Sequence, residues 1–266
     1  MLPDTIDMGP ADASQAVLLL HGIGGRAAGW HAVQTHLAEQ GWRSIAWDMP
    51  GYGRSPALAA SDMAALAQAL HQLRRHKGVT QAVLVGHSLG GMVALQAWAD
   101  APEGIAAMLL AATSPAFGHG DGDFQQQFLA QRLAPLEAGQ SMAQVAERLV
   151  PTMAAPGTPA ERLAPACAHM ASIAPAAYLQ ALQALVRFEQ RQALPTVTVP
   201  VLCLAAEHDR TASPQVMQRM AAKMPGARYA CLAQAGHLLH YEQPEAFMAA
   251  LDEFLAGLAP ALSPRR

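Results

Sequence analysis

The segment Gly86-His87-Ser88-Leu89-Gly90-Gly91 constrains the fold more than any other part of this sequence. It contains a G-x-S-x-G pattern between the apolar run 82–85 and the helix-like stretch 92–98. A serine in a sharp strand-to-helix turn has a strained backbone, small neighbours permit the turn, and the hydroxyl points away from the sheet edge. An incidental glycine turn is the alternative, but the strand before it and the helix after it favour Ser88 as a candidate nucleophile.

Short apolar runs alternate with amphipathic stretches over most of the chain. Runs typical of buried strands lie at 16–20, 43–47, 81–86, 105–112, 201–206 and 228–232. Helix-like stretches lie at about 28–40, 61–77, 89–100, 213–224 and 244–258. This order predicts an α/β fold with a mostly parallel sheet and helices on both of its faces.

The alternation stops in the middle of the chain, which suggests an inserted unit. Between residues 114 and 195 the strand-like runs disappear, and helical periodicity is interrupted by prolines that include Pro135, Pro151 and Pro165. Glycines mark the entry to this stretch at positions 118, 120 and 122. We therefore expect a core formed by residues 1–113 and 196–266, with a helical cap formed by residues 114–195.

A nucleophilic serine needs a base and an acid that orients the base. Asp209 follows the strand-like run 201–206, and His237 follows the run 228–232. The carboxyl ends of parallel strands share one edge of a sheet, where open α/β sheets carry their sites. We predict a catalytic triad of Ser88, His237 and Asp209. Glu207 is the rival acid, although it lies nearer the end of its strand.

Other polar residues near these positions have simpler interpretations. His240 follows His237 by three residues and could pair with it in a metal site, but no further ligand cluster accompanies it. We interpret His240 as a histidine whose hydrogen bonds are satisfied near the last helix, and predict no metal site. His87 should pack beside the serine turn, and Glu242 should cap or pair near the last helix.

The stretch after the first apolar run can stabilise an oxyanion. Glycines around Ile23 allow close approach of the backbone to a substrate, so we assign the backbone N–H groups of Ile23 and Leu89 to an oxyanion hole. The same stretch, Gly22 to Ala27, fits a dinucleotide-binding pattern with Asp48 after the next strand. His21 and the triad would have no role in such a site, so we predict no bound cofactor.

Charge and hydropathy exclude several other classes. The chain has 17 Lys and Arg against 20 Asp and Glu, a net charge of -3, which does not favour binding to nucleic acid or to an anionic membrane. Its longest uninterrupted apolar run, 105–112, is far below the ~18 residues that span a bilayer. The first residues lack the pattern of a signal peptide, so we expect a cytoplasmic protein. Monomer and homodimer both remain open.

These motifs resemble those of the α/β-hydrolase superfamily. The likeness lies in the stretches 21–25, 48–55, 86–91, 207–209 and 236–237, and is weakest over the cap. It implies a mostly parallel sheet of eight strands, a helical lid and a cofactor-free mechanism. Only about fifteen residues precede the first clear strand, so the usual N-terminal antiparallel hairpin should be short or poorly formed. The stretch 235–247 is similar to small-molecule esterases and 3-oxoadipate enol-lactonases.

The expected reaction is hydrolysis of a small-molecule carboxylic ester or lactone. Acyl transfer, cofactor-free perhydrolysis and carbon–carbon bond hydrolysis use the same triad and stay open, as does a ligand-binding module without catalysis. Methionines of the cap (Met142, Met153 and Met170) favour an apolar pocket. Five cap arginines could bind a substrate carboxylate, but are more typical of surface ion pairs: Arg132, Arg148, Arg162, Arg187 and Arg191.

Overall fold

A seven-stranded sheet organises the described part of the chain. The computed structural model describes residues 2–59, 62–117, 123–258 and 262. The strands are β1 (Thr5–Met8), β2 (Gln15–Leu20), β3 (Ser44–Trp47), β4 (Gln81–His87), β5 (Ile105–Ala111), β6 (Val201–Ala206) and β7 (Arg228–Leu232). Residues of β2 alternate between two apolar clusters, with Leu18 and Leu20 in one and Val17 and Leu19 in the other, so both faces of the sheet are buried.

The strand order is β1-β3-β2-β4-β5-β6-β7, and every neighbouring pair is parallel except β1 with β3. The expectation of eight strands is therefore wrong for the described residues. The N-terminal strand is four residues long and pairs with β3, with Thr5 opposite Trp47, instead of forming a hairpin with β2.

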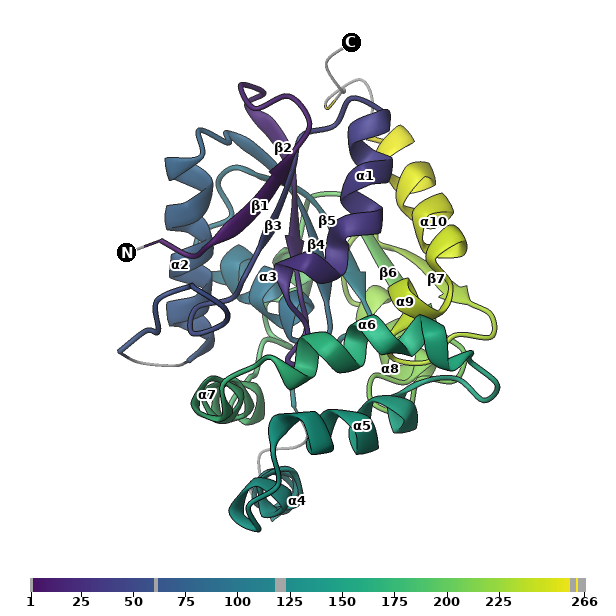
Figure 1. The fold of residues 1–266 in the computed structure, drawn as a ribbon. Coiled ribbons are helices and arrows are strands. Elements are labelled where there is room, and N and C mark those ends of the chain that lie inside the picture. Colours follow the sequence, from purple (N-terminus) through teal and green to yellow (C-terminus); the bar gives the residue numbers. More distant parts are fainter. Residues whose placement is uncertain (1, 60–61, 118–122, 259–261, 263–266) are drawn as a thin grey trace.

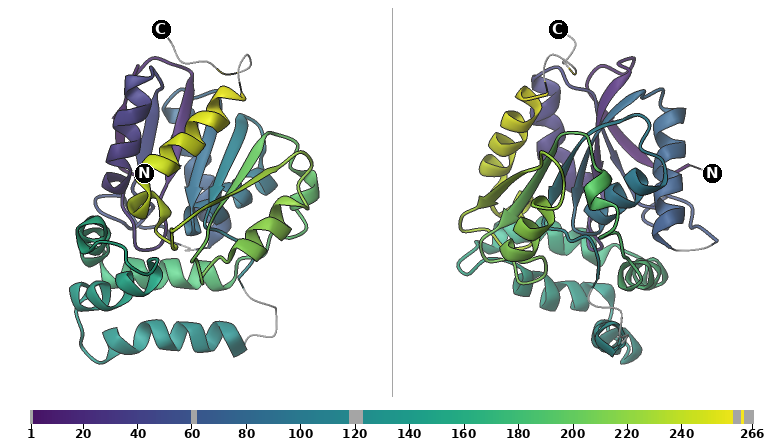
Figure 2. Two further views of the ribbon diagram at one scale, coloured as in Figure 1. Left: turned by 90° about the vertical axis from the view of Figure 1, so that its right-hand side faces the viewer. Right: turned by 180° about the vertical axis from the view of Figure 1, so that it is seen from behind.

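Helices cover both faces of the sheet (Figures 1 and 2). On one face lie α1 (His31–Glu39) and α10 (Pro244–Ala256), which bury Leu37 and Phe247. The other face carries α2 (Met63–His76), α3 (Leu89–Asp100) and α8 (Pro214–Ala221). In the part of the chain that the structure describes, no helix has both the length and the apolar character needed to cross a membrane.

Among the described residues, four α-helices lie between β5 and β6 in the chain, and they gather beyond the carboxyl ends of the parallel strands (Figures 1 and 2). These inserted helices are α4 (Asp123–Glu137), α5 (Met142–Met153), α6 (Ala160–Ala171) and α7 (Pro175–Val186). The glycines at 118, 120 and 122, expected at the entry, lie outside the described residues. The inserted helices face the edge where the parallel strands end, and this placement encloses the space above Ser88.

Candidate active site

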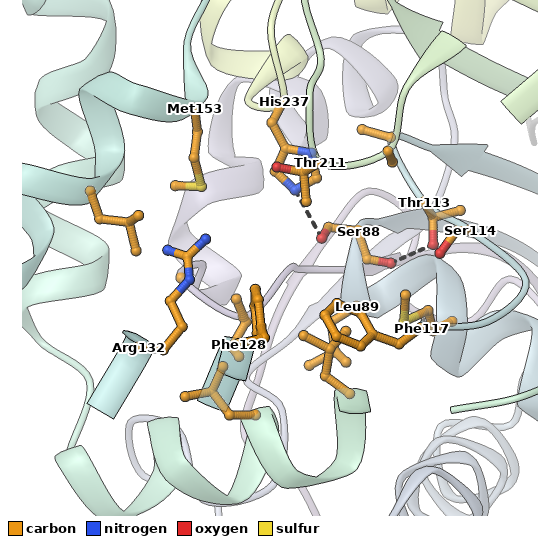
Figure 3. Close-up of a pocket in the computed structure, with 18 of the residues that line it drawn as sticks. Ser88, Leu89, Thr113, Ser114, Phe117, Phe128, Arg132, Met153, Thr211 and His237 are labelled. Atoms are coloured by element: carbon orange, nitrogen blue, oxygen red, sulfur yellow. Dashed lines mark hydrogen bonds between the residues drawn. The ribbon is translucent and has the colours of Figure 1, made fainter. Parts of the chain in front are cut away.

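Ser88 lies at a strained turn between β4 and α3. Its φ of 51° and ψ of -116° are unusual for a residue with a side chain. The turn depends on close backbone approaches, because a Cβ at Gly86 would lie 2.5 Å from the carbonyl oxygen of Gly90, and one at Gly90 would overlap the carbonyl oxygen of Leu20. The G-x-S-x-G pattern therefore has a steric cause, and the turn presents the Ser88 hydroxyl to the cavity (Figure 3).

The structure brings together the three side chains of the predicted triad. Nε2 of His237 is 3.0 Å from Oγ of Ser88, and Nδ1 of His237 is 2.8 Å from Oδ2 of Asp209. A proton on Nδ1 donates to the Asp209 carboxylate, which leaves Nε2 free to accept the serine proton. His237 and Asp209 are 5% and 3% exposed. The arrangement can therefore activate a hydroxyl in a nearly dry site.

The surroundings of Asp209 keep its carboxyl ionised. Burial alone would raise its pKa, but His237 and the backbone N–H groups of Thr211 and Ala212 more than offset burial, so that the pKa lies below its usual value. The rival acid Glu207 is exposed, and its carboxylate accepts a hydrogen bond from the backbone N–H of Gln234. Geometry thus selects Asp209 as the partner of the imidazole.

Glu242 organises the loop that carries His237, a role that the sequence did not indicate. Its carboxylate, only 3% exposed, accepts hydrogen bonds from the backbone N–H groups of Gly236 and Leu238 on either side of the histidine. It also accepts from the N–H of Ala155, in the connection between α5 and α6. Because one carboxylate ties the histidine loop to the inserted helices, it fixes the position of the imidazole relative to the cavity.

Glu242→Gln should lower kcat by about 10- to 100-fold with a smaller change in KM, because an amide offers one acceptor oxygen to these N–H groups and places its own NH₂ among them. Steady-state kinetics on an ester substrate, with a urea titration to show folding, would measure this. Glu245→Gln is the matched control, since Glu245 is exposed and pairs with Arg162. A folded Glu242→Gln variant with unchanged kcat would contradict the positioning role.

The loop 21–25 is held by His21. The backbone N–H of Met49 donates to Nε2 of His21 over 2.9 Å, so the ring proton is on Nδ1 and donates to the carbonyl oxygen of Gly22 over 2.7 Å. Ile23 and Leu89, the predicted oxyanion donors, both line the cavity that contains Ser88. Because the Gly22 carbonyl accepts a hydrogen bond from His21, the backbone conformation at Ile23 is restrained beside Ser88.

Asp48 is engaged within the protein, which bears on the dinucleotide alternative. Its carboxylate accepts two hydrogen bonds from the guanidinium of Arg26, both of 2.8 Å, and a third from the backbone N–H of Ala27. Burial alone would raise its pKa, but these partners hold the pKa below its usual value. A carboxylate with these three partners is a structural anchor for the loop after β2, rather than a free acceptor for a ribose hydroxyl.

His240 does not have the satisfied hydrogen bonds that we expected. Its Nδ1 is buried without a hydrogen-bond partner in the described structure, and its ring stacks on Trp30 with 4.6 Å between centroids. His87 does pack beside the turn, as expected, and its Nε2–H donates to the carbonyl oxygen of His237 over 2.7 Å. The expectation for His240, which lies in α9 (Leu239–Glu242), failed because its surroundings come from the short helix η1 (Ala27–Trp30), from β4 and from α10, which only folding brings together.

Three buried histidines should make the fold sensitive to acid. Burial lowers the pKa of His21 to about 4 and of His87 to about 3, and lowers that of His240 well below its usual value. Since the unfolded chain takes up these protons near pH 6.5 while the folded chain does not, the free energy of unfolding should decrease as pH falls from 6.5 toward 4. Each histidine contributes about 1.4 kcal/mol per pH unit in that window.

Urea titrations between pH 7 and pH 4.5 would measure this slope. His240→Phe keeps a ring against Trp30, so we expect it to reduce the slope by about 1.4 kcal/mol per pH unit. His31→Gln, at an exposed position, is the control. If His240→Phe has the slope of the unmodified protein, protonation of His240 does not contribute to acid unfolding.

Two cavities meet at Ser88. The first measures about 680 Å³ with its open mouth and extends between α4, α5 and α7, where Phe128, Met153 and Tyr178 line it (Figure 3). The second measures about 510 Å³, again with its open mouth, and is lined by residues such as Trp30 and His240. Ser88 and His237 line both, together with Ile23, Gly24, Met153 and Met170. A ligand bound at Ser88 can therefore extend into either cavity.

The chain belongs to the α/β-hydrolase family, whose family model matches residues 15–244 and is described as the alpha/beta hydrolase fold. A protein from Variovorax paradoxus (strain S110) named as a carbamate hydrolase, RutD, is 34% identical and is matched over 93% of this chain and 94% of its own. A pimeloyl-[acyl-carrier protein] methyl ester esterase from Stenotrophomonas maltophilia (strain K279a) is 29% identical, and the match covers 92% of this chain and 94% of that protein.

Solved structures agree with the fold. A thermophilic esterase from Thermogutta terrifontis superposes with a TM-score of 0.85 at 26% identity, over 96% of this chain and 93% of that one. An enol-lactonase from Burkholderia xenovorans LB400 gives the same TM-score at 21% identity, over 95% and 96% of the two chains. At this lower identity the likeness establishes the fold alone.

Proposed function

We propose that this α/β hydrolase cleaves a small-molecule carboxylic ester or lactone, with Ser88 as the nucleophile, His237 as the base and Asp209 as the orienting acid. The observation that carries the proposal is the hydrogen-bonded series from Ser88 through His237 to Asp209, at the point where two cavities meet. Relatives named as esterases support the same reaction class.

In the proposed mechanism, Oγ of Ser88 attacks the substrate carbonyl while its proton moves to Nε2 of His237. The oxyanion accepts hydrogen bonds from the backbone N–H groups of Ile23 and Leu89, the latter at the N-terminus of α3. The alcohol leaves with the proton from His237. Water then attacks the acyl-enzyme, gives a proton to His237 and releases the carboxylic acid as the proton returns to Ser88.

We also propose that the inserted helices act as a cap that selects the substrate. Residues of α4, α5 and α7 supply much of the first cavity, and Met170 of α6 lines both cavities. Methionine side chains adapt to ligands of different shape, so these cavities should accept apolar substrate groups of different shapes. Met142, by contrast, is buried in the core and lines neither cavity.

A panel of p-nitrophenyl esters, lactones and aryl carbamates tests the function, with a fluorophosphonate probe as a report on the nucleophile. We expect turnover of esters or lactones, and mass spectrometry should locate the probe on Ser88. Carbamates belong in the panel because one relative is named as a carbamate hydrolase. If the protein hydrolyses carbamates faster than esters and lactones, it is a carbamate hydrolase instead. A folded protein that neither reacts with the probe nor hydrolyses any of these compounds would be a ligand-binding module.

A further inference from the structure

Arg132 places a positive charge in the first cavity. This residue of α4 is half-buried, and its side chain points into the space beside Met153 and Phe128 (Figure 3). Most of the other lining side chains are aliphatic, aromatic or thioether groups, and the few hydroxyls belong to Ser88, Thr113, Ser114, Tyr178 and Thr211. Among the described residues that line this cavity, none is an Asp or Glu. The guanidinium of Arg132 is therefore a charged group in a cavity whose walls are mostly apolar.

The contacts of Arg132 hold its guanidinium without neutralising it. Cζ lies 5.0 Å from the centre of the Phe128 ring, one helical turn away on α4. Arg132 also interacts with the Tyr178 hydroxyl, and it partly offsets the rise that burial causes in the pKa of Tyr178. Within the described ranges, no carboxylate forms an ion pair with Arg132. Packing against an aromatic face leaves the N–H groups at the edge of the guanidinium plane available.

The other cap arginines emphasise the difference. Arg162 pairs with Glu245, and Arg191 pairs with Glu189, so a carboxylate faces each of these two guanidinium groups. Arg148 is exposed on α5 and lines neither cavity that meets at Ser88. Of the five arginines considered in the sequence, only Arg132 lines the cavity that contains the nucleophile. An anionic ligand in this cavity would give the half-buried guanidinium a partner of opposite charge.

We propose that Arg132 is a specificity-determining residue that binds a carboxylate of the substrate, so that the preferred substrates are esters or lactones with a free carboxylate. The fork of N–H donors matches the two oxygens of a carboxylate. One guanidinium balances the single negative charge of a carboxylate, whereas a phosphate dianion would remain half-neutralised among apolar side chains. A cavity with one cation therefore favours the carboxylate.

This inference rests on the proposed function. Three substrates can distinguish a failure of the Arg132 proposal from a failure of the proposed function. The first compound is the monoethyl ester of a dicarboxylic acid, with the carboxylate on the acyl side. The second is the acetate ester of a hydroxy acid, with the carboxylate on the alcohol side. The third is the neutral diester of the same dicarboxylic acid. We expect kcat/KM for one of the two anionic esters to exceed that for the neutral ester.

Arg132→Gln should lower kcat/KM for the preferred anionic ester by about 10- to 100-fold and leave the neutral ester within about twofold, because only the anionic ester loses charge-assisted hydrogen bonds. Arg132→Lys should retain part of the preference, since it keeps the charge without the fork. Arg148→Gln removes the same charge from an exposed position of the neighbouring helix and is the matched control.

Three outcomes would overturn the assignment of Arg132. Equal loss on neutral and anionic esters would indicate a packing role on Phe128, and an equal effect of Arg148→Gln would indicate a long-range effect of net charge. If the unmodified protein showed no preference for anionic esters, the proposal that Arg132 binds a substrate carboxylate would have no basis. In each case neutral esters still turn over, so the proposed function stands. Loss of turnover for all esters in the unmodified protein would instead contradict that function.

Discussion

Ser88→Ala should lower kcat for ester hydrolysis by about 10⁶-fold, because the residues of a serine triad act as a unit. The substitution removes the hydroxyl that lies 3.0 Å from Nε2 of His237 and leaves the turn, the cavities and the loop 21–25 in place. The oxyanion donors and the binding surfaces should then support a residual rate of about 10³- to 10⁴-fold over water. Steady-state kinetics and probe labelling measure both quantities.

Ser14→Ala is the control for this prediction. Ser14 is exposed and immediately precedes β2, at the amino end of the parallel strands, whereas the candidate site lies at their carboxyl end. It should retain full activity and full labelling. If purified Ser88→Ala retained substantial esterase activity, or if the probe labelled another serine in the unmodified protein, Ser88 would not be the nucleophile.

The strands and the serine turn could be predicted from the sequence because their causes are local. The apolar run 201–206 corresponds to the whole of β6, and the stretch 89–100 corresponds to the whole of α3. The inserted helices were harder to delimit. Pro135, Pro151 and Pro165, expected to interrupt helices, lie inside α4, α5 and α6. A proline within a helix is tolerated where tertiary packing compensates for the lost hydrogen bond, which a sequence pattern does not reveal.

In the candidate site, too, some features could be predicted from the sequence and others could not. Ser88, Asp209 and His237 each follow a strand, and parallel strands bring their carboxyl ends together, so that topology predicts the cluster. The role of Glu242 depends in part on the backbone N–H of Ala155, in the connection after α5 and 87 residues away in the chain. Arg132 reaches the cavity only because of the way α4 packs on the other inserted helices. Contacts of this kind arise from tertiary packing and have no local pattern.

Asp209→Asn should lower kcat by about 10⁴-fold while the protein keeps its fold. The amide oxygen can still accept from the backbone N–H groups of Thr211 and Ala212, which now hold the carboxylate at 2.7 and 3.0 Å. The amide NH₂ would then face Nδ1 of His237 and donate to it, so that the ring proton moves to Nε2. An imidazole with its proton on Nε2 cannot accept the proton of Ser88.

Two further variants make this prediction specific. Glu207→Gln, which alters the exposed rival acid two residues earlier, should leave kcat nearly unchanged. The double variant Ser88→Ala/Asp209→Asn should be no slower than Ser88→Ala alone, because without the nucleophile the orientation of His237 has no proton transfer to assist. Additive losses would show that Asp209 contributes to catalysis independently of the serine. A large loss in Glu207→Gln with little effect of Asp209→Asn would exchange the roles of the two acids, against the 2.8 Å contact of Asp209 with His237.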